Sequence, residues 1–146
     1  MISKQKWIII TICVVAITLI STILIYNSKI NKVQRRYSID LPKTSEVLYS
    51  YEDIGWFGDG ATIANVIMSE NDFNELYESL YTGKPNDLSD EKLKEEITTN
   101  INTFLRTSSN DYWPNWDNDN RLITEEGNYY IFDFDLHILI MIRIIM

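Results

Sequence analysis

An uninterrupted apolar segment near the N-terminus constrains the fold of this chain more than any other feature. No charged residue occurs from Ile8 to Ile25, and the few polar side chains are hydroxyls that can bond back to their own helix. Trp7 and Tyr26 bracket the segment 19 residues apart, which corresponds to roughly 28 Å of helix. A bilayer's hydrocarbon core has a similar thickness, and aromatic residues favour its two interfaces. Residues 7–26 are therefore predicted to form one transmembrane helix.

A cleaved secretory signal is the main alternative, because Lys4 and Lys6 precede the apolar segment as basic residues do in signal peptides. The segment is too long for that reading, and no pair of small residues follows it at the spacing of a cleavage site. Cys13 does not fit a lipoprotein site, since Ile12 precedes it where a small residue is expected. As the only cysteine it permits no internal disulfide. We expect an uncleaved signal anchor.

Four segments divide the 146 residues. Residues 1–6 are a short basic tail, and residues 7–26 are the transmembrane helix. Residues 27–38 are polar and free of proline and glycine, so we expect them to form a juxtamembrane stalk. Residues 39–146 follow as one acidic α+β domain, whose size suits a single core. The hydrophobic share of 45% indicates that this part folds.

Charge is distributed unevenly along the chain. All 21 acidic residues lie at or after Asp40, so residues 37–146, with seven basic residues, carry a net charge of −14. Such a domain repels phosphate groups. The sequence therefore argues against nucleic acid as a partner and against binding of this domain to anionic lipid headgroups.

The orientation of the predicted anchor is ambiguous, because basic residues flank both of its ends. Two precede it and four follow it: Lys4 and Lys6, then Lys29, Lys32, Arg35 and Arg36. Counted strictly, the positive-inside rule favours a cytoplasmic domain. A six-residue tail ahead of a first hydrophobic helix is instead the usual form of a signal anchor that leaves its N-terminus inside. We expect the domain to lie outside.

The acidic domain is predicted to have the order ββααββ. Two β-type runs surround an Asp-Gly turn, two segments with apolar residues at helical spacing follow, and two further β-type runs end the chain. The predicted strands are residues 45–54, 61–68, 129–134 and 138–144, and the predicted helices are residues 69–83 and 89–105. We expect a four-stranded, largely antiparallel sheet packed against both helices, with residues 107–120 as a loop. Residues 61–68 are almost continuously apolar, which indicates a strand covered on both faces.

Residues that common catalytic sites require are scarce. The single histidine, His137, falls in a predicted turn, and no cysteine follows the anchor, which argues against nucleophile–base sites and zinc sites. No phosphate-binding glycine motif is present. Pairs such as Asp133 with Asp135, or Glu125 with Glu126, are nominal acid–base pairs for a hydrolase, but chance pairs are expected in so acidic a chain. We predict no catalytic, cofactor-binding or metal-binding residue, and a carboxylate-based hydrolase remains an alternative.

Residues 115–126 partly match a calcium-binding loop. Oxygen-bearing side chains fall at its first, third, fifth and twelfth positions: Asn115, Asp117, Asp119 and Glu126. The glycine that such a loop needs is replaced by Asn120, and Pro114 excludes an ordinary entering helix. We interpret the stretch as a solvated acidic loop.

Aromatic residues beside glycines form the most unusual cluster. Trp56 and Phe57 adjoin Gly58-Asp59-Gly60, and a second aromatic group follows much later in the chain. A tight turn with one aromatic ring packed on the core is the simplest interpretation. The alternative is a contact patch for a protein partner, since exposed tryptophans often dominate interfaces. The candidate partner-binding residues are Trp56, Phe57, Asp59, Tyr112, Trp113 and Trp116.

Several motifs in order resemble a group of small uncharacterised lipoproteins and membrane-anchored proteins of Gram-positive bacteria. The motifs are Ile-Asp-Leu-Pro at 39–42, Gly-Trp-Phe-Gly-Asp-Gly-Ala-Thr at 55–62, Ser-Glu-Asn-Asp-Phe at 69–73 and Tyr-Ile-Phe-Asp-Phe-Asp at 130–135. The likeness spans most of residues 39–140 and implies a membrane-tethered, extracytoplasmic domain, but no activity. The chain departs from the pattern at Leu136-His137 and in its very apolar ending.

The function expected from these features is binding at the cell membrane. We interpret the chain as a single-pass protein that contacts the bilayer through residues 7–26 and offers a non-enzymatic interaction module to a protein partner. The acidic domain would also suit an inhibitor or immunity-type protein that neutralises a basic toxin or enzyme.

Overall fold

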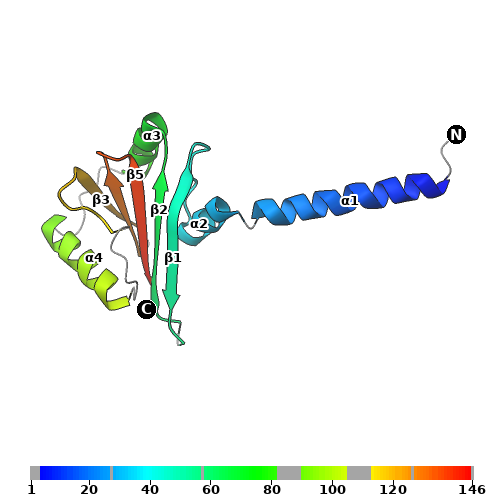
Figure 1. Ribbon diagram of the computed structural model, residues 1–146. Coiled ribbons are helices and arrows are strands. Elements are labelled where there is room, and N and C mark those ends of the chain that lie inside the picture. Colours follow the sequence, from blue (N-terminus) through cyan, green and yellow to red (C-terminus); the bar gives the residue numbers. More distant parts are fainter. Residues whose placement is uncertain are drawn as a thin grey trace.

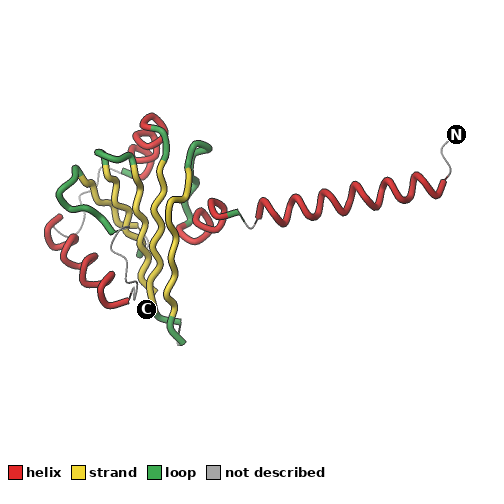
Figure 2. Tube along the Cα trace, viewed as in Figure 1, coloured by secondary structure: helices red, strands yellow, loops and turns green. Residues whose placement is uncertain are grey.

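The structure, a computed structural model, describes residues 4–26, 28–56, 58–81, 90–104, 113–125 and 127–145. A long N-terminal helix, α1 (Lys4–Tyr26), projects from a domain built of one sheet and three helices within this described part (Figure 1). Figure 2 shows that the strands lie together in one layer and that helices lie on both sides of it. The domain is therefore α+β, as predicted.

The described sheet has five antiparallel strands in the order β1-β2-β5-β4-β3. Their bounds are β1 Glu46–Ile54, β2 Gly60–Ile67, β3 Asn120–Glu125, β4 Asn128–Asp133 and β5 Ile138–Ile145. The β1–β2 and β4–β5 hairpins were predicted. The pairing of β2 with β5 joins the first hairpin to the last one and makes one continuous sheet.

Strand β3 corrects the predicted four-stranded sheet and the order ββααββ. It pairs with β4 along its whole length through a tight turn in which Gly127 has a φ of 78°. Two adjacent residues, Leu122 and Ile123, are buried on opposite faces of the sheet, while most of their neighbours are polar. A six-residue strand with one buried side chain per face lacks the repeated alternation that reveals a strand.

The two faces of the sheet carry separate hydrophobic clusters. On one face, side chains such as Val66, Phe132 and Met141 pack with helices α2 and α3. On the other, Ile63 and Ile140 pack with α4. Strand β2 is buried along nearly its whole length, which confirms that a strand at 61–68 is covered on both sides.

Helices α3 (Glu70–Leu80) and α4 (Asp90–Phe104) follow their predicted periodicity. The hydroxyl of Ser69 caps α3 by accepting a hydrogen bond from the backbone N–H of Asp72. Buried residues recur at helical spacing in both helices: Phe73, Leu76 and Tyr77 in α3, and Leu93, Ile97 and Ile101 in α4. The predicted cap of the second helix, Ser89, lies outside the described residues.

Helix α2 (Lys29–Tyr37) replaces the expected stalk. It begins after Ser28 and ends at Ser38, which adopts a left-handed conformation with a φ of 54°. Val33 and Tyr37 are 1% and 0% exposed, so α2 belongs to the folded domain. Ile30, Val33 and Tyr37 form one narrow apolar stripe within an otherwise polar segment. That stripe is why the segment packs on the sheet.

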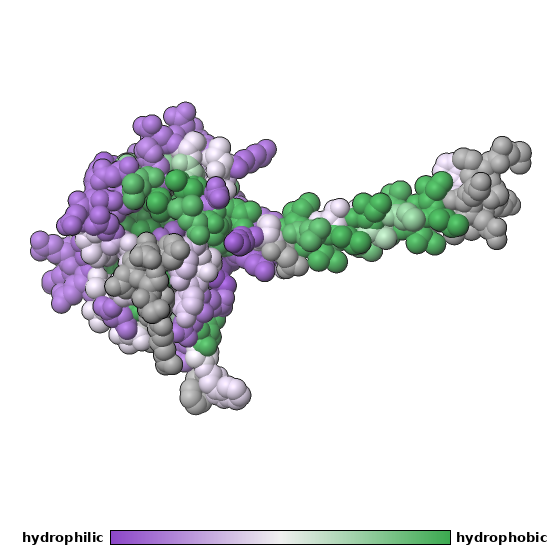
Figure 3. All heavy atoms as spheres, viewed as in Figure 1, coloured by the Kyte–Doolittle hydropathy of each residue, from purple (hydrophilic) through white to green (hydrophobic). Residues whose placement is uncertain are grey.

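In the described chain, α1 is the one helix that is long and apolar enough to cross a membrane. Its stretch Ile9–Tyr26 has a mean hydropathy of 2.6, and none of that stretch is buried. Figure 3 shows hydrophobic residues along the helix and mainly hydrophilic ones around the outline of the domain. Thr11, Thr18 and Thr22 each donate to a carbonyl one turn earlier, as expected. A helix of this kind is either a membrane anchor or a signal sequence.

Candidate functional site

The tip of the β1–β2 hairpin holds Trp56 almost wholly in solvent. Its side chain is 96% exposed, more than any other large hydrophobic residue described in the structure. The Gly55 N–H donates to the Asp59 carbonyl at 2.6 Å, and the Gly58 N–H donates to the Gly55 carbonyl at 3.0 Å. These bonds close the turn that carries Trp56. Asp59 thus helps to shape the tip through its backbone, whereas Phe57 lies outside the described residues.

Trp113 and Trp116 occupy a different environment. Both are half-buried and pack against the hydrophobic cluster under α4, where the Lys94 ammonium lies 5.5 Å from the ring centre of Trp116. The nearby Asn118 and Asp119 hydrogen-bond to the β4–β5 turn, at the end of the sheet opposite the Trp56 hairpin. The structure does not bring Trp56 and Trp116 together. Tyr112 lies outside the described residues.

The carboxylate pair Asp133 and Asp135 supports the β4–β5 turn. Asp133 is buried, accepts hydrogen bonds from the backbone N–H groups of Asp135 and Leu136, and also accepts one from the Asn118 amide at 2.7 Å. Asp135 accepts a hydrogen bond from the Asp119 backbone N–H. Both carboxylates therefore hold two loops together. Glu126, a member of the other nominal pair, lies outside the described residues.

The calcium-like stretch does not form a continuous loop, because its second half is strand β3. Asn120 donates to the carbonyls of Asn115 and Asn118, and this bonding folds the preceding residues into a short turn. Among the residues that the structure describes, no three histidine, cysteine, aspartate or glutamate side chains gather in a way that could hold a metal ion.

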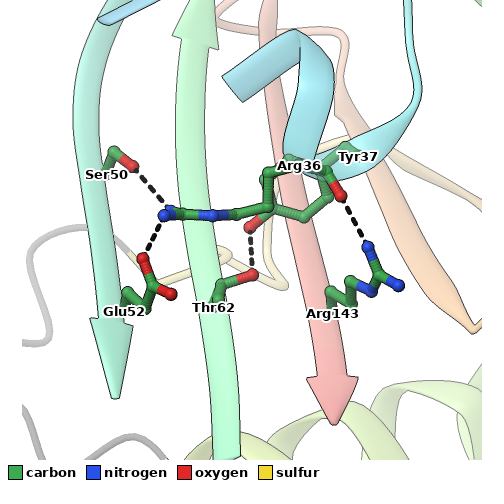
Figure 4. A network of polar contacts seen from close by, with 6 residues as sticks. All are labelled: Arg36, Tyr37, Ser50, Glu52, Thr62 and Arg143. Atoms are coloured by element: carbon green, nitrogen blue, oxygen red, sulfur yellow. Dashed lines mark hydrogen bonds and ion pairs between the residues drawn. The ribbon is translucent and has the colours of Figure 1, made fainter. Parts of the chain in front are cut away.

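A polar network fastens the C-terminal end of α2 to the sheet (Figure 4). The Tyr37 and Thr62 hydroxyls share a hydrogen bond of 2.9 Å beneath the helix. The Arg143 guanidinium donates to the Arg36 carbonyl at 2.7 Å, and the Arg36 guanidinium forms an ion pair with Glu52 on β1. Three strands therefore hold the last turn of α2.

Burial has a consequence for Tyr37. Removal from water disfavours the phenolate and raises the pKa of Tyr37 well above its usual value, although the hydrogen bond to Thr62 opposes the shift. The Tyr37 carbonyl also accepts a hydrogen bond from the Tyr130 hydroxyl at 3.0 Å. On the other face, burial together with a hydrogen bond to Glu96 raises the pKa of Tyr129 to about 12.

One face of α2, together with the preceding Ser28, contacts the end of α1. The Arg35 guanidinium donates to the Tyr26 carbonyl at 2.8 Å and lies 3.9 Å from the centre of the Tyr26 ring. The Asn31 amide and the Ser28 N–H both donate to the Ile25 carbonyl. Carbonyls at the end of a helix lack partners within it, so these bonds cap α1 with groups from α2.

A shallow hollow of about 310 Å³ opens beside this junction. It is lined by Asn31, Gln34, Arg35, Ser38, Ile39 and Asp40. The junction is not evident as a site from the sequence, because the polar character of residues 27–38 hides the buried stripe. The spacing of Ile30, Val33 and Tyr37 is the signal that would have found it.

The fold and this junction together define a class: an acidic α+β domain with a five-stranded antiparallel sheet, joined by a short fastened helix to an exposed apolar helix. No protein-family model matches the chain, and no curated protein or solved structure shows a significant similarity to it. The resemblance to membrane-anchored proteins of Gram-positive bacteria therefore stays a prediction.

Proposed function

We propose that this chain is a single-pass membrane protein whose acidic domain is a protein-binding module outside the cell membrane, with Trp56 as the centre of the contact. The observation that carries the binding function is the 96% exposure of Trp56 on a closed hairpin tip. The resemblance supports the outside orientation.

The contacts at the end of α1 support an anchor that stays attached. A cleaved signal would separate from the domain, whereas here α2 supplies hydrogen bonds to the last carbonyls of α1 and a cation over the Tyr26 ring. Tyr26 is also an aromatic residue of the kind that prefers a membrane interface. Anchor and domain thus form a continuous structure through a short junction.

The exposed indole supports a binding role on energetic grounds. Burying a large apolar side chain stabilises a protein by about 1.5–3 kcal/mol, and Trp56 forgoes that gain in the free molecule. A partner that covers the ring recovers it. Because the turn that carries Trp56 is closed by two backbone hydrogen bonds, the backbone there loses little conformational freedom on binding.

Photocrosslinking in intact cells tests this proposal. A photoreactive amino acid replaces Trp56 in one version of the chain and Leu136, an exposed residue at the tip of the β4–β5 turn, in another. We expect a discrete adduct from position 56 alone. Trp56→Ala should then weaken co-purification of that partner about tenfold or more, while Leu136→Ala retains it. Equal adducts from both positions, or unchanged co-purification of Trp56→Ala, would contradict the proposal.

A second candidate is an inhibitor or immunity-type protein, which the charge of α3 favours. Its exposed residues include Glu70, Glu75 and Glu78, and the helix contains no basic residue. A basic toxin or enzyme would complement this surface. Binding that weakens steeply with salt would favour this candidate over contact through Trp56. A carboxylate-based hydrolase has less support, because Asp133 and Asp135 are engaged in holding loops.

A further inference from the structure

We infer that the outer face of α2 lies on the membrane surface and binds anionic lipid headgroups. This surface, the headgroup face, consists of Asn31, Lys32 and Arg35 with Lys29 at its side. The inference rests on the proposed anchoring of α1 and goes beyond it, because it assigns a lipid-binding role to the folded domain.

The position of α2 puts the headgroup face at the end of the membrane helix. Figure 1 shows α2 between the sheet and α1. Val33 and Tyr37 point into the core, whereas Asn31 and Arg35 reach the last residues of α1. Residues four apart share one face of a helix, so the face that meets α1 is opposite the buried one. A bilayer that ends at Tyr26 therefore lies against this face.

The charge of α2 matches an anionic surface. Lys29, Lys32 and Arg35 are exposed, and the helix contains no acidic residue. Basic residues close to a membrane are attracted to anionic lipids. Arg36 is not counted in this face, because its charge is neutralised by the ion pair with Glu52.

This placement changes the expectation drawn from net charge. The net charge of −14 covers residues 37–146, so it leaves out the four basic residues of α2. With α2 packed on the sheet, the domain has a basic side that adjoins the anchor and an acidic remainder. Asp40 is the acidic residue among those that line the hollow with Arg35. Anionic lipids repel the acidic rest of the domain, so the domain is favoured to turn α2 toward the membrane.

Fluorescence quenching on the full-length chain tests the inference. Cys13→Ala removes the native thiol, and Ser38→Cys places a small fluorophore at the exposed end of α2. The protein is reconstituted in nanodiscs of phosphatidylcholine alone or mixed with phosphatidylglycerol, each with a lipid that carries a nitroxide on its headgroup. We expect quenching about twofold stronger in the anionic nanodiscs, and weaker quenching at high salt.

Charge variants identify the residues responsible. Lys29→Gln with Lys32→Gln should abolish the difference between the two lipid compositions, and Lys29→Arg with Lys32→Arg should retain it. Lys92→Gln with Lys94→Gln makes the same charge change on α4, on the other face of the sheet, and should also retain it.

Three results would overturn the inference: equal quenching in both compositions, no quenching in either, or an equal loss in the α2 and α4 variants. A chain that does not enter nanodiscs would instead refute the anchor on which the inference rests. Partner binding through Trp56 is measured separately, so its failure leaves the quenching result intact.

Discussion

At the residue scale, two glycines shape the hairpin that carries Trp56, and they do so for different reasons. Gly60 has a φ of 155°, and a Cβ added there would lie 2.0 Å from the Asp53 carbonyl oxygen. Gly58 has a φ of 83°, but an added Cβ would meet open space. Close approach of two backbones thus requires glycine at 60, while conformation alone favours it at 58.

The difference between Gly60 and Gly58 predicts different losses of stability when each is replaced by alanine. Gly60→Ala should lower the free energy of unfolding by about 3 kcal/mol or more, because β1 and β2 must move apart. Gly58→Ala should cost about 1 kcal/mol, the usual strain of a left-handed non-glycine residue. Chemical denaturation followed by circular dichroism measures both values. Similar losses for the two variants would contradict the account of the hairpin.

Sequence alone identified Trp56 as unusual but left its environment open. A tryptophan beside a turn either packs on the core or points away from it, and its exposure in the folded chain shows that Trp56 points away. Asp133 shows the same limit. Two carboxylates two residues apart suit an acid–base pair or a turn, and only the N–H groups around Asp133 reveal the turn.

At the element scale, periodic segments were predictable and short ones were not. α3 and α4 repeat their apolar residues over several turns, and β2 is mostly apolar, so their burial follows from the sequence pattern. β3 has too few buried residues for a repeat to stand out, and the apolar stripe of α2 is narrow and lies within a polar segment. Their positions come from pairing with β4 and from packing on the sheet, which are long-range interactions.

The burial of Tyr37 at the end of α2 predicts how the stability of the domain changes at alkaline pH. The raised pKa of buried Tyr37 means that the folded domain keeps its phenolic proton more tightly than the unfolded chain does. This stabilisation is fully present below the unfolded pKa of about 10 and is lost as pH rises above it. Thermal unfolding between pH 7 and pH 12 should therefore show stability that falls above about pH 10.

Tyr37→Phe should make that fall shallower by about 1.4 kcal/mol per pH unit, the effect of one proton. Thr62→Val is the matched control. It removes the partner hydroxyl, so it should lower stability at neutral pH by about 1 kcal/mol, but it leaves the phenol and keeps the alkaline slope. The same slope in Tyr37→Phe and in the unaltered chain would show that Tyr37 ionises equally in both states.

At the scale of the whole molecule, the elements form layers along the direction of α1. The apolar helix comes first, then α2, then the sheet, and α4 covers the far face (Figure 1). Under the proposed anchoring by α1, the α4 side of the domain faces away from the membrane and the Trp56 hairpin lies at the side of the domain. The sequence predicted the anchor and the domain but not this order, because the order depends on the burial of α2.

Reciprocal labelling in intact cells tests the central claim, that α1 anchors the domain outside the membrane. In a Cys13→Ala background, Thr99→Cys places a thiol on the exposed surface of α4, and Ser3→Cys places one ahead of the anchor. A membrane-impermeant maleimide should label position 99 in intact cells and position 3 only after lysis. The reverse pattern would contradict the orientation, and recovery of the chain in the soluble fraction would contradict the anchor.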